Sequence, residues 1–279
     1  MAGRKLDMGA AWSSAMGLIG QNKDTVGAIV SLFYFLPYLA VGLLAPEVAN
    51  PQPAEVAPGA TAQAALDQIS AAYADNWPVL LGVTLAQFIG SLTLLALLGN
   101  PDSPTVGEAL KRGLGAAPSY FVSQVLSALL VSIVVGVPLG LTVAIAPGAV
   151  AAVVGIAALV GAIYLFVKFS LLAPIVAIEG VRNPISALQR SWRLTKGNSF
   201  RIFAFIALLV ITIGIVSVLV SLVFGLVFAL FDQGIADIGN AVVAAIVNTV
   251  LGVVFVLVLA AVHQQLAGPT GEQFAATFE

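Results

Sequence analysis

The side chains that could do chemistry in this 279-residue chain are few and widely spaced. The absence of cysteine excludes disulfides, thiolate metal sites and cysteine nucleophiles. A single histidine, His263, cannot build a metal site alone, so we expect it to form an interfacial hydrogen bond. Glu179 and Arg182 stand three residues apart, which favours a structural ion pair over a catalytic carboxylate. These residues predict no catalytic, metal or cofactor site.

Several other polar or small residues lie inside apolar runs. Lys168 lies about 28 Å along its run at 1.5 Å per residue, so we expect its amine to snorkel to a membrane interface. A buried functional lysine is the alternative. Gln87 and Asn248 are amides at mid-depth, and we expect them to join helices rather than bind substrate. The pair Gly136 and Gly140 forms a GxxxG motif, which predicts close helix packing.

The clearest local pattern is the basic stretch 183–201, which begins with an asparagine and a proline that suit a helix start. Gly197 suits the helix end, so the pattern predicts an amphipathic helix over 184–196. The large apolar side chains fall on one half of the helical wheel, namely Ile185, Leu188, Trp192 and Leu194. The basic side chains fall on the other half, namely Arg190, Arg193 and Lys196. This pattern is typical of a helix in the membrane interface, and a plain connector whose charges only fix topology is the alternative.

Composition indicates the environment of the rest of the chain. Hydrophobic residues make up 60% and charged residues 9%, and the mean hydropathy is +1.06. Soluble domains carry about 25% charged residues, so most of this chain is surrounded by lipid. The first apolar run extends from near Val26 to Leu44, which is too long for a signal peptide, and we interpret it as a retained span.

Apolar runs long enough to cross a bilayer occur six times. They cover about 25–44, 78–98, 120–145, 149–172, 202–231 and 241–266. Short interfacial helices are expected over about 7–20, 104–114 and 184–196, with Ser103 capping the second of them. A polar loop, 45–77, joins the first two spans. The prediction is an all-α polytopic membrane helix bundle forming a single domain, 1–279.

The basic residues are strongly segregated along the chain. All 11 lie before the first span, between the second and third, or from the late fourth span to the start of the fifth. The positive-inside rule then predicts cytosolic N- and C-termini. A weak motif repeat links 103–112 with 183–190, because each has a capping residue and a proline ahead of a basic helix. With 7–20 as a degenerate copy, this would make a three-fold hairpin repeat, and chance similarity is the alternative.

One segment, Leu172 to Phe203, resembles a signature region of the glycerophosphoryl diester phosphodiesterase membrane-domain family. The matching residues are Pro174, Glu179, Asn183-Pro184, Ala187-Leu188, Arg190-Ser191 and Leu194-Thr195-Lys196-Gly197. In that family a soluble phosphodiesterase barrel can follow the membrane domain, whereas here only a short tail follows the last span. The resemblance therefore implies a membrane module without the hydrolase, in a bacterial inner membrane.

We therefore expect a non-catalytic membrane module in the cell membrane that interacts with anionic lipids, a membrane protein partner or a second copy of itself. The residues expected to contact lipid headgroups are all basic, namely Lys111, Arg112, Arg190, Arg193, Lys196 and Arg201. The remaining polar residues are expected to be structural, namely Lys168, Glu179, Arg182, Gln87, Asn248 and His263. Nothing indicates nucleic-acid binding. A small transporter or carrier of a lipid or hydrophobic compound is the alternative, and an intramembrane lipid-acting enzyme is a weaker one.

Overall fold

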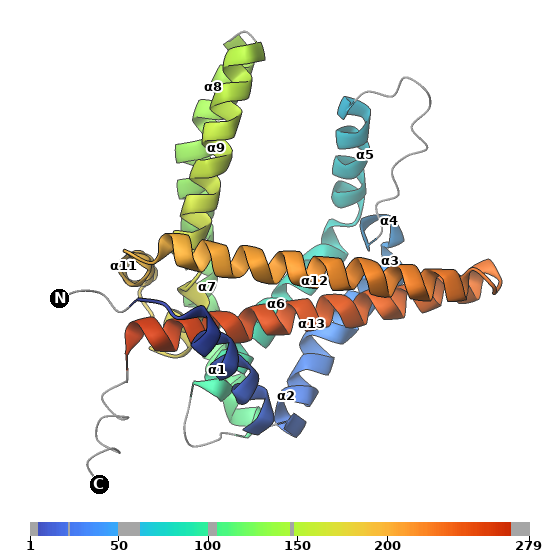
Figure 1. The fold of residues 1–279 in the computed structure, drawn as a ribbon, viewed down its shortest axis with the longest axis horizontal. Coiled ribbons are helices and arrows are strands. Elements are labelled where there is room, and N and C mark those ends of the chain that lie inside the picture. Colours follow the sequence, from blue (N-terminus) through green and yellow to red (C-terminus); the bar gives the residue numbers. More distant parts are fainter. Residues whose placement is uncertain (1–4, 22, 50–61, 100–104, 146–147, 269–279) are drawn as a thin grey trace. The chain divides into compact units, whose positions relative to one another are not determined.

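The structure is a computed structural model that describes residues 5–21, 23–49, 62–99, 105–145 and 148–268, which are helical over most of their length (Figure 1). Six helical segments of this described part are long and apolar enough to cross a membrane. They are Lys23–Leu44, Trp77–Leu98, Val106–Thr142, Gly148–Ala177, Ser199–Phe228 and Gln233–Ala267. The chain is a multi-pass α-helical membrane protein, and the predicted fold class is confirmed.

The elements follow one another without any strand in the described residues. The first half contains α1 (Met8–Gln21), α2 (Lys23–Val30), the π-helical turn η1 (Ser31–Phe35), α3 (Leu36–Leu44), α4 (Pro46–Ala49), α5 (Ala62–Asp75) and α6 (Trp77–Leu98). The second half contains α7 (Val106–Val131), the π-helical turn η2 (Ser132–Gly136), α8 (Val137–Ile145), α9 (Gly148–Phe169), α10 (Leu172–Ala177), α11 (Pro184–Thr195), α12 (Ser199–Phe228) and α13 (Gln233–Ala267).

Two spans contain a π-helical turn just before a proline. η1 leads to Pro37 and η2 leads to Pro138. Proline has no N–H, and its ring clashes with the carbonyl four residues earlier in a regular helix. The wider π turn accommodates that ring, so each helix continues through its proline instead of ending there.

The third span differs from its prediction, because no separate interfacial helix covers 104–114. α7 runs without a break from Val106 into the apolar part of the span. Its start is stabilised by a capping box between Thr105 and Glu108, so Thr105 is the cap. The predicted cap, Ser103, lies outside the described residues, as does residue 104.

Two other boundaries also differ from the predictions. The fourth span breaks at Ser170 and Leu171, because the ring of Pro174 would clash with the carbonyl of Ser170 in a continuous helix. The last span begins at Gln233 rather than near 241, since the Asp232 carboxylate accepts the Ile235 N–H at 3.2 Å and caps the helix. The predicted loop 45–77 contains α4 and α5, and its part 50–61 lies outside the described residues.

The chain forms two compact units. The first comprises 1–22, 92–207 and 256–279, and the second comprises 23–91 and 208–255. Within the first unit α8 and α9 pack as a hairpin (Figure 1), and α11 packs against α7, α9 and α10. The short helix α10 is buried over Leu172–Val176 and packs against α7 and α11.

The N-terminal segment is tied into the first unit by polar contacts. The N–H of Leu6 donates to Asn198 Oδ1 at 2.9 Å, and Arg201 Nη1 donates to the carbonyl of Leu6 at 3.0 Å. The N–H of Asp7 donates to Gln265 Oε1 at 3.1 Å. The start of α12 and the end of α13 therefore lie beside the start of α1.

The second unit contains one of the two predicted mid-depth amide contacts. Gln87 of α6 hydrogen-bonds to Tyr38 of α3, so it joins the first and second spans. Next to it, the hydroxyls of Tyr34 and Ser91 are 2.6 Å apart. Asn248 does not join helices through any hydrogen bond of the described residues, because its amide donates to the carbonyl of Ala244 in its own helix at 2.9 Å.

The predicted GxxxG packing in the third span is wrong. A Cβ atom placed on Gly136 or Gly140 would meet nothing within 4 Å among the described residues. Close approach occurs at Gly113 instead, where such an atom would lie 2.6 Å from Thr93 Oγ1 and 2.9 Å from the Thr93 nitrogen. Gly113 brings α7 onto α6 because it has no side chain.

Candidate functional site

The helix α11 and its two ends frame the candidate site. Asn183 Oδ1 accepts hydrogen bonds from two backbone N–H groups of the first turn, at 3.0 and 3.2 Å, and Pro184 follows it. After the helix, Gly197 has φ of +83°, a backbone conformation that glycine adopts without steric cost. The helix predicted over 184–196 is confirmed.

The buried face of α11 is not made of its large apolar residues, apart from Leu188. Its buried residues are mostly small or polar, namely Ala187, Leu188, Ser191 and Thr195. Ile185 and Trp192, which belong to the predicted apolar half of the helix, are 59% and 39% exposed. The small side chains let α11 approach α9 so closely that Ser191 Oγ donates to the carbonyl of Lys168 at 2.7 Å. Large apolar side chains are therefore left on the outer face.

The centre of the site is the carboxylate of Glu179, in the segment between α10 and α11. Arg190 donates to both of its oxygens, with Nε 3.0 Å from Oε2 and Nη2 3.0 Å from Oε1. His263 near the end of α13 has Nε2 2.9 Å from the same Oε1. One carboxylate thus holds together the segment after α10, the helix α11 and the end of α13.

The predicted pair of Glu179 with Arg182 is wrong. The residues between them are not helical, and Gly180 turns the chain with φ of 69°. Arg182 instead donates from Nη1 to the carbonyl of Gly115, while its own carbonyl accepts from Ser119 Oγ at 2.6 Å. Arg182 therefore fastens this segment to α7.

The electrostatic surroundings of Glu179 favour its ionised form. Burial would raise the pKa of this carboxyl, but hydrogen bonds from His263 and Arg190 and their charges lower its pKa to about 2 from an ordinary 4.5. An ionised carboxylate can only accept, so His263 Nε2 carries a proton. His263 Nδ1 is fully buried and has no hydrogen-bond partner among the described residues. The ring serves as a donor that holds Glu179 in place.

This arrangement predicts sensitivity to acid. Because the folded-state pKa of Glu179 is lowered, its ionised form stabilises the fold above the ordinary pKa of 4.5, and this contribution is lost as the pH falls toward about 2. We expect the thermal midpoint of the detergent-purified protein to fall more steeply below about pH 5 than that of Glu179→Gln, which cannot ionise. Tryptophan-fluorescence melts at several pH values measure this, and parallel curves would contradict it.

Lys168, in the last turn of α9, is buried. Its residue is only 3% exposed, and Nζ lies 5.3 Å from the ring centre of Tyr164 and 5.2 Å from that of Trp192. This geometry is a cation–π contact. The amine therefore contacts two aromatic rings of the protein instead of extending freely to the membrane interface, and the residue is buried as the alternative expected.

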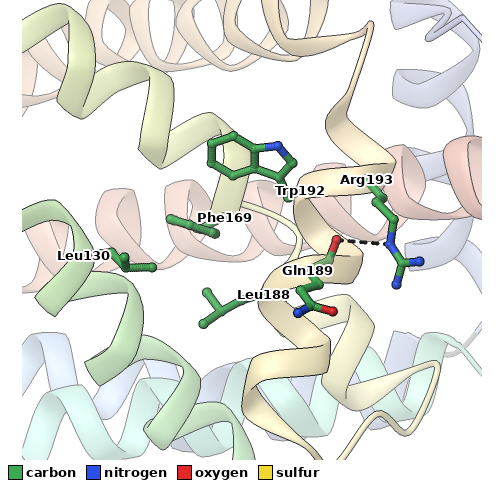
Figure 2. Close-up of a pocket in the computed structure, with 6 residues that line it drawn as sticks. All are labelled: Leu130, Phe169, Leu188, Gln189, Trp192 and Arg193. Atoms are coloured by element: carbon green, nitrogen blue, oxygen red, sulfur yellow. Dashed lines mark hydrogen bonds between the residues drawn. The ribbon is translucent and has the colours of Figure 1, made fainter. Parts of the chain in front are cut away.

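An open groove of about 440 Å³ lies beside these rings. Figure 2 shows the side chains from α7, α9 and α11 that line it, namely Leu130, Phe169, Leu188, Gln189, Trp192 and Arg193. Its walls are mostly apolar, and the rings of Phe169 and Trp192 have centres 5.9 Å apart. Arg193 lies on the side away from Leu130, and its Nε is 3.4 Å from the carbonyl of Gln189 (Figure 2).

The basic residues predicted to contact lipid have different surroundings. Lys111, Arg112, Arg193 and Lys196 are exposed, and none forms an ion pair with a carboxylate in the part of the chain that the structure describes. Two others already have protein partners, since Arg190 binds Glu179 and Arg201 binds the carbonyl of Leu6. Of the six basic residues, four are thus exposed without an ion pair in the described part and two are engaged by the protein itself.

Several residues that hold the site together were missed from the sequence. Asn198 is 3% exposed and accepts from the N–H of Leu6. Ser119, Ser191 and Gln265 each bond to the backbone of a segment distant in sequence. No local pattern distinguishes these side chains from ordinary polar residues near a membrane surface, because their partners are brought close only by folding.

Metal chemistry requires a cluster of ligands, and nucleophilic chemistry requires a nucleophile beside a base. No group of three or more His, Cys, Asp or Glu residues that could hold a metal ion occurs among the described residues. Glu179 and His263 bond to each other and to Arg190, and no hydroxyl or amine nucleophile hydrogen-bonds to either of them in the described part. Their described contacts join the segment after α10, α11 and the end of α13.

A family model for the membrane domain of glycerophosphoryl diester phosphodiesterase matches residues 143–267. The resemblance to this membrane-domain family is therefore confirmed over that range, which holds α9 to α13, Glu179, Arg190 and His263. The match concerns the membrane domain, and no catalytic domain is matched. Comparisons with curated proteins and with solved structures found no match to this chain.

Proposed function

We propose that this chain is a non-catalytic membrane module that binds anionic lipid at the outer face of α11. One observation carries this proposal. Arg193 and Lys196 are exposed and lack a carboxylate partner among the described residues, and Arg193 lines an apolar groove of about 440 Å³. Each basic residue near an anionic membrane surface contributes about 1 kcal/mol to attraction, and an apolar groove suits an acyl chain.

The outward tryptophans support a position in the membrane interface. Trp192 of α11 is 39% exposed and Trp12 of α1 is 42% exposed. Beside Trp12, by contrast, Ala11 and Ala15 are fully buried. Tryptophan is enriched at membrane–water interfaces because its large ring is apolar and its N–H can bind water or headgroups. Both helices thus have the amphipathic surface that an interfacial location requires.

We further propose that the face of the first unit bearing α1 and α11 lies on the cytosolic side of the cell membrane, a bacterial inner membrane by the family resemblance. Two observations support this orientation. The basic residues cluster in the segments before the first span and before the fifth, as the positive-inside rule requires. The segment just before α1 is also hydrogen-bonded both to the start of α12 and to the end of α13.

Removal of two charges tests the lipid proposal. We expect Arg193→Gln with Lys196→Gln to weaken binding of phosphatidylglycerol about 20–30-fold, because two contributions of about 1 kcal/mol are lost. Native mass spectrometry of the gently purified protein, with lipid identification and titration of phosphatidylglycerol, measures this. Arg190 is left unchanged because its guanidinium binds Glu179.

The matched control is Lys5→Gln with Lys23→Gln, which removes the same charge from exposed positions that do not line the groove. It should retain nearly all of the lipid bound by the parent. Equal lipid binding by the parent and the α11 variant would contradict the proposal. Retention of a neutral small molecule, unaffected by either variant, would instead favour a carrier of hydrophobic compounds.

A further inference from the structure

Lys168 is a cation whose surroundings do not balance its charge. Its residue is 3% exposed, and its Nζ contacts the faces of Tyr164 and Trp192 rather than a carboxylate. In the described part of the chain the ion pairs found are those of Glu179 with Arg190 and His263, so Lys168 has none there. Its position in the last turn of α9 and its contact with two rings both stabilise a cation. These stabilising free energies are small compared with the cost of burying an unpaired charge.

A second cation adds to this excess of positive charge. Lys196 directly follows α11, the helix that Ser191 Oγ fastens to the carbonyl of Lys168, and its charge acts on that of Lys168. Two ammonium groups close together repel one another unless an anion lies between or beside them. This neighbourhood is complementary to a phosphate group, whose oxygens accept several hydrogen bonds from ammonium donors.

The ammonium of Lys168 also has open donors. Nζ donates no hydrogen bond to any described residue. It is also not fully buried, because the fully buried polar atom without a partner in the described part is His263 Nδ1. Nζ therefore keeps a small accessible area, although the residue as a whole is only 3% exposed. An anion can approach it without unfolding the aromatic cluster.

The same tryptophan connects this cationic position to the groove. The ring of Trp192 contacts Lys168 Nζ, and Trp192 lines the groove together with Leu130 and Phe169 (Figure 2). A ligand that binds the Lys168 ammonium and also fills the apolar groove needs an anionic group joined to a hydrocarbon chain. Because α7 and α9 are membrane spans, a membrane phospholipid is the occupant with this chemistry.

We propose that Lys168 and Lys196 bind the phosphate of one phospholipid, whose acyl chain lies along Trp192, Phe169 and Leu130. This inference rests on the proposed function, and it goes further by assigning a single lipid position and a buried residue that holds it. An anionic headgroup such as that of phosphatidylglycerol suits two adjacent ammonium groups better than zwitterionic phosphatidylcholine, whose own cation would add to the positive charge.

Quenching of Trp192 fluorescence tests this position directly. In a background with Trp12→Phe and Trp77→Phe, Trp192 is the remaining tryptophan of the chain's three. The protein is reconstituted in phosphatidylcholine liposomes containing either brominated phosphatidylglycerol or brominated phosphatidylcholine. We expect brominated phosphatidylglycerol to quench at about tenfold lower fractions, because charge-assisted hydrogen bonds hold its phosphate beside the ring. Equal quenching by the two lipids would overturn the inference without any variant of Lys168.

Substitutions separate this inference from the broader proposal. Lys168→Met should remove the preference for phosphatidylglycerol, Lys168→Arg should retain most of it, and the exposed control Lys5→Met should leave it unchanged. If Lys168→Met keeps the preference while Arg193→Gln with Lys196→Gln loses it, lipid binding at α11 stands and the role of Lys168 is refuted. If the parent shows no lipid preference in quenching or in mass spectrometry, both proposals fail. Displacement of the lipid by millimolar-range inorganic phosphate would indicate a site for free phosphate instead.

Discussion

Glu179→Ala should lower the free energy of unfolding by about 3 kcal/mol, because it leaves two donors without their shared acceptor. The side chain of Glu179 is 16% exposed and that of His263 is 3% exposed, so water cannot fully replace the carboxylate. For a chain of this size we expect a fall in thermal midpoint of roughly 6–12 °C. Fluorescence-monitored thermal melts of the detergent-purified protein measure this change.

The control for this prediction is Asp237→Ala. Asp237 is an exposed carboxylate with no hydrogen bond or ion pair among the described residues, so its removal should change the midpoint by no more than about 1–2 °C. Arg190→Ala in the Glu179→Ala background should cost much less than in the parent, because the partner is already missing. Independent, additive losses would show that the carboxylate does not join these elements.

Gly113→Val should destabilise the protein by about 3 kcal/mol or more, since a side chain at this position has no room. A Cβ atom there would lie 2.6 Å from Thr93 Oγ1, and 2.9 and 3.0 Å from the nitrogen and Cα of Thr93. Two of these three atoms belong to the backbone of α6, so no rotamer change relieves the overlap. We expect a large loss of monodisperse protein in detergent, measured by fluorescence-detected size-exclusion chromatography.

Gly107→Val, in the same helix, is the matched control. A Cβ atom at Gly107 would meet nothing within 4 Å among the described residues. The difference in helix propensity between valine and glycine is small compared with the free-energy cost of the overlap expected at Gly113. The Gly107 variant should therefore elute like the parent. Comparable losses from both substitutions would show that helix propensity, rather than the crossing of α6 and α7, limits stability.

The site was only partly predictable. The basic helix, its Asn183 cap and its Gly197 end followed from residue types at fixed spacings, because capping and left-handed turns are local interactions. The partner of Glu179 did not follow. A spacing of three favoured Arg182, whereas the actual partners, Arg190 and His263, are 11 and 84 residues away.

The face of α11 that packs against protein did not follow from the sequence either. The helical wheel grouped Trp192 and Ile185 on an apolar half suited to the membrane interface, but it did not show which residues contact other helices. In this chain Ala187 and Ser191 pack inward instead, because lipid accepts large apolar side chains at no cost and small residues permit close helix contact. In a membrane protein, apolar periodicity therefore does not identify which face of a helix packs against other helices.

By itself, the sequence determined that this is an α-helical protein with six membrane-spanning segments and a capped basic helix before the fifth. Those features depend on hydrophobic run length and on backbone hydrogen bonds within each segment, which lipid makes obligatory. The tertiary structure alone decided that Glu179 joins α11 to α13, that Lys168 lies beneath Tyr164 and Trp192, and that a groove accompanies them. The physical reason is that these contacts join residues from different helices, and pairing between helices is set by side-chain shape and charge in three dimensions.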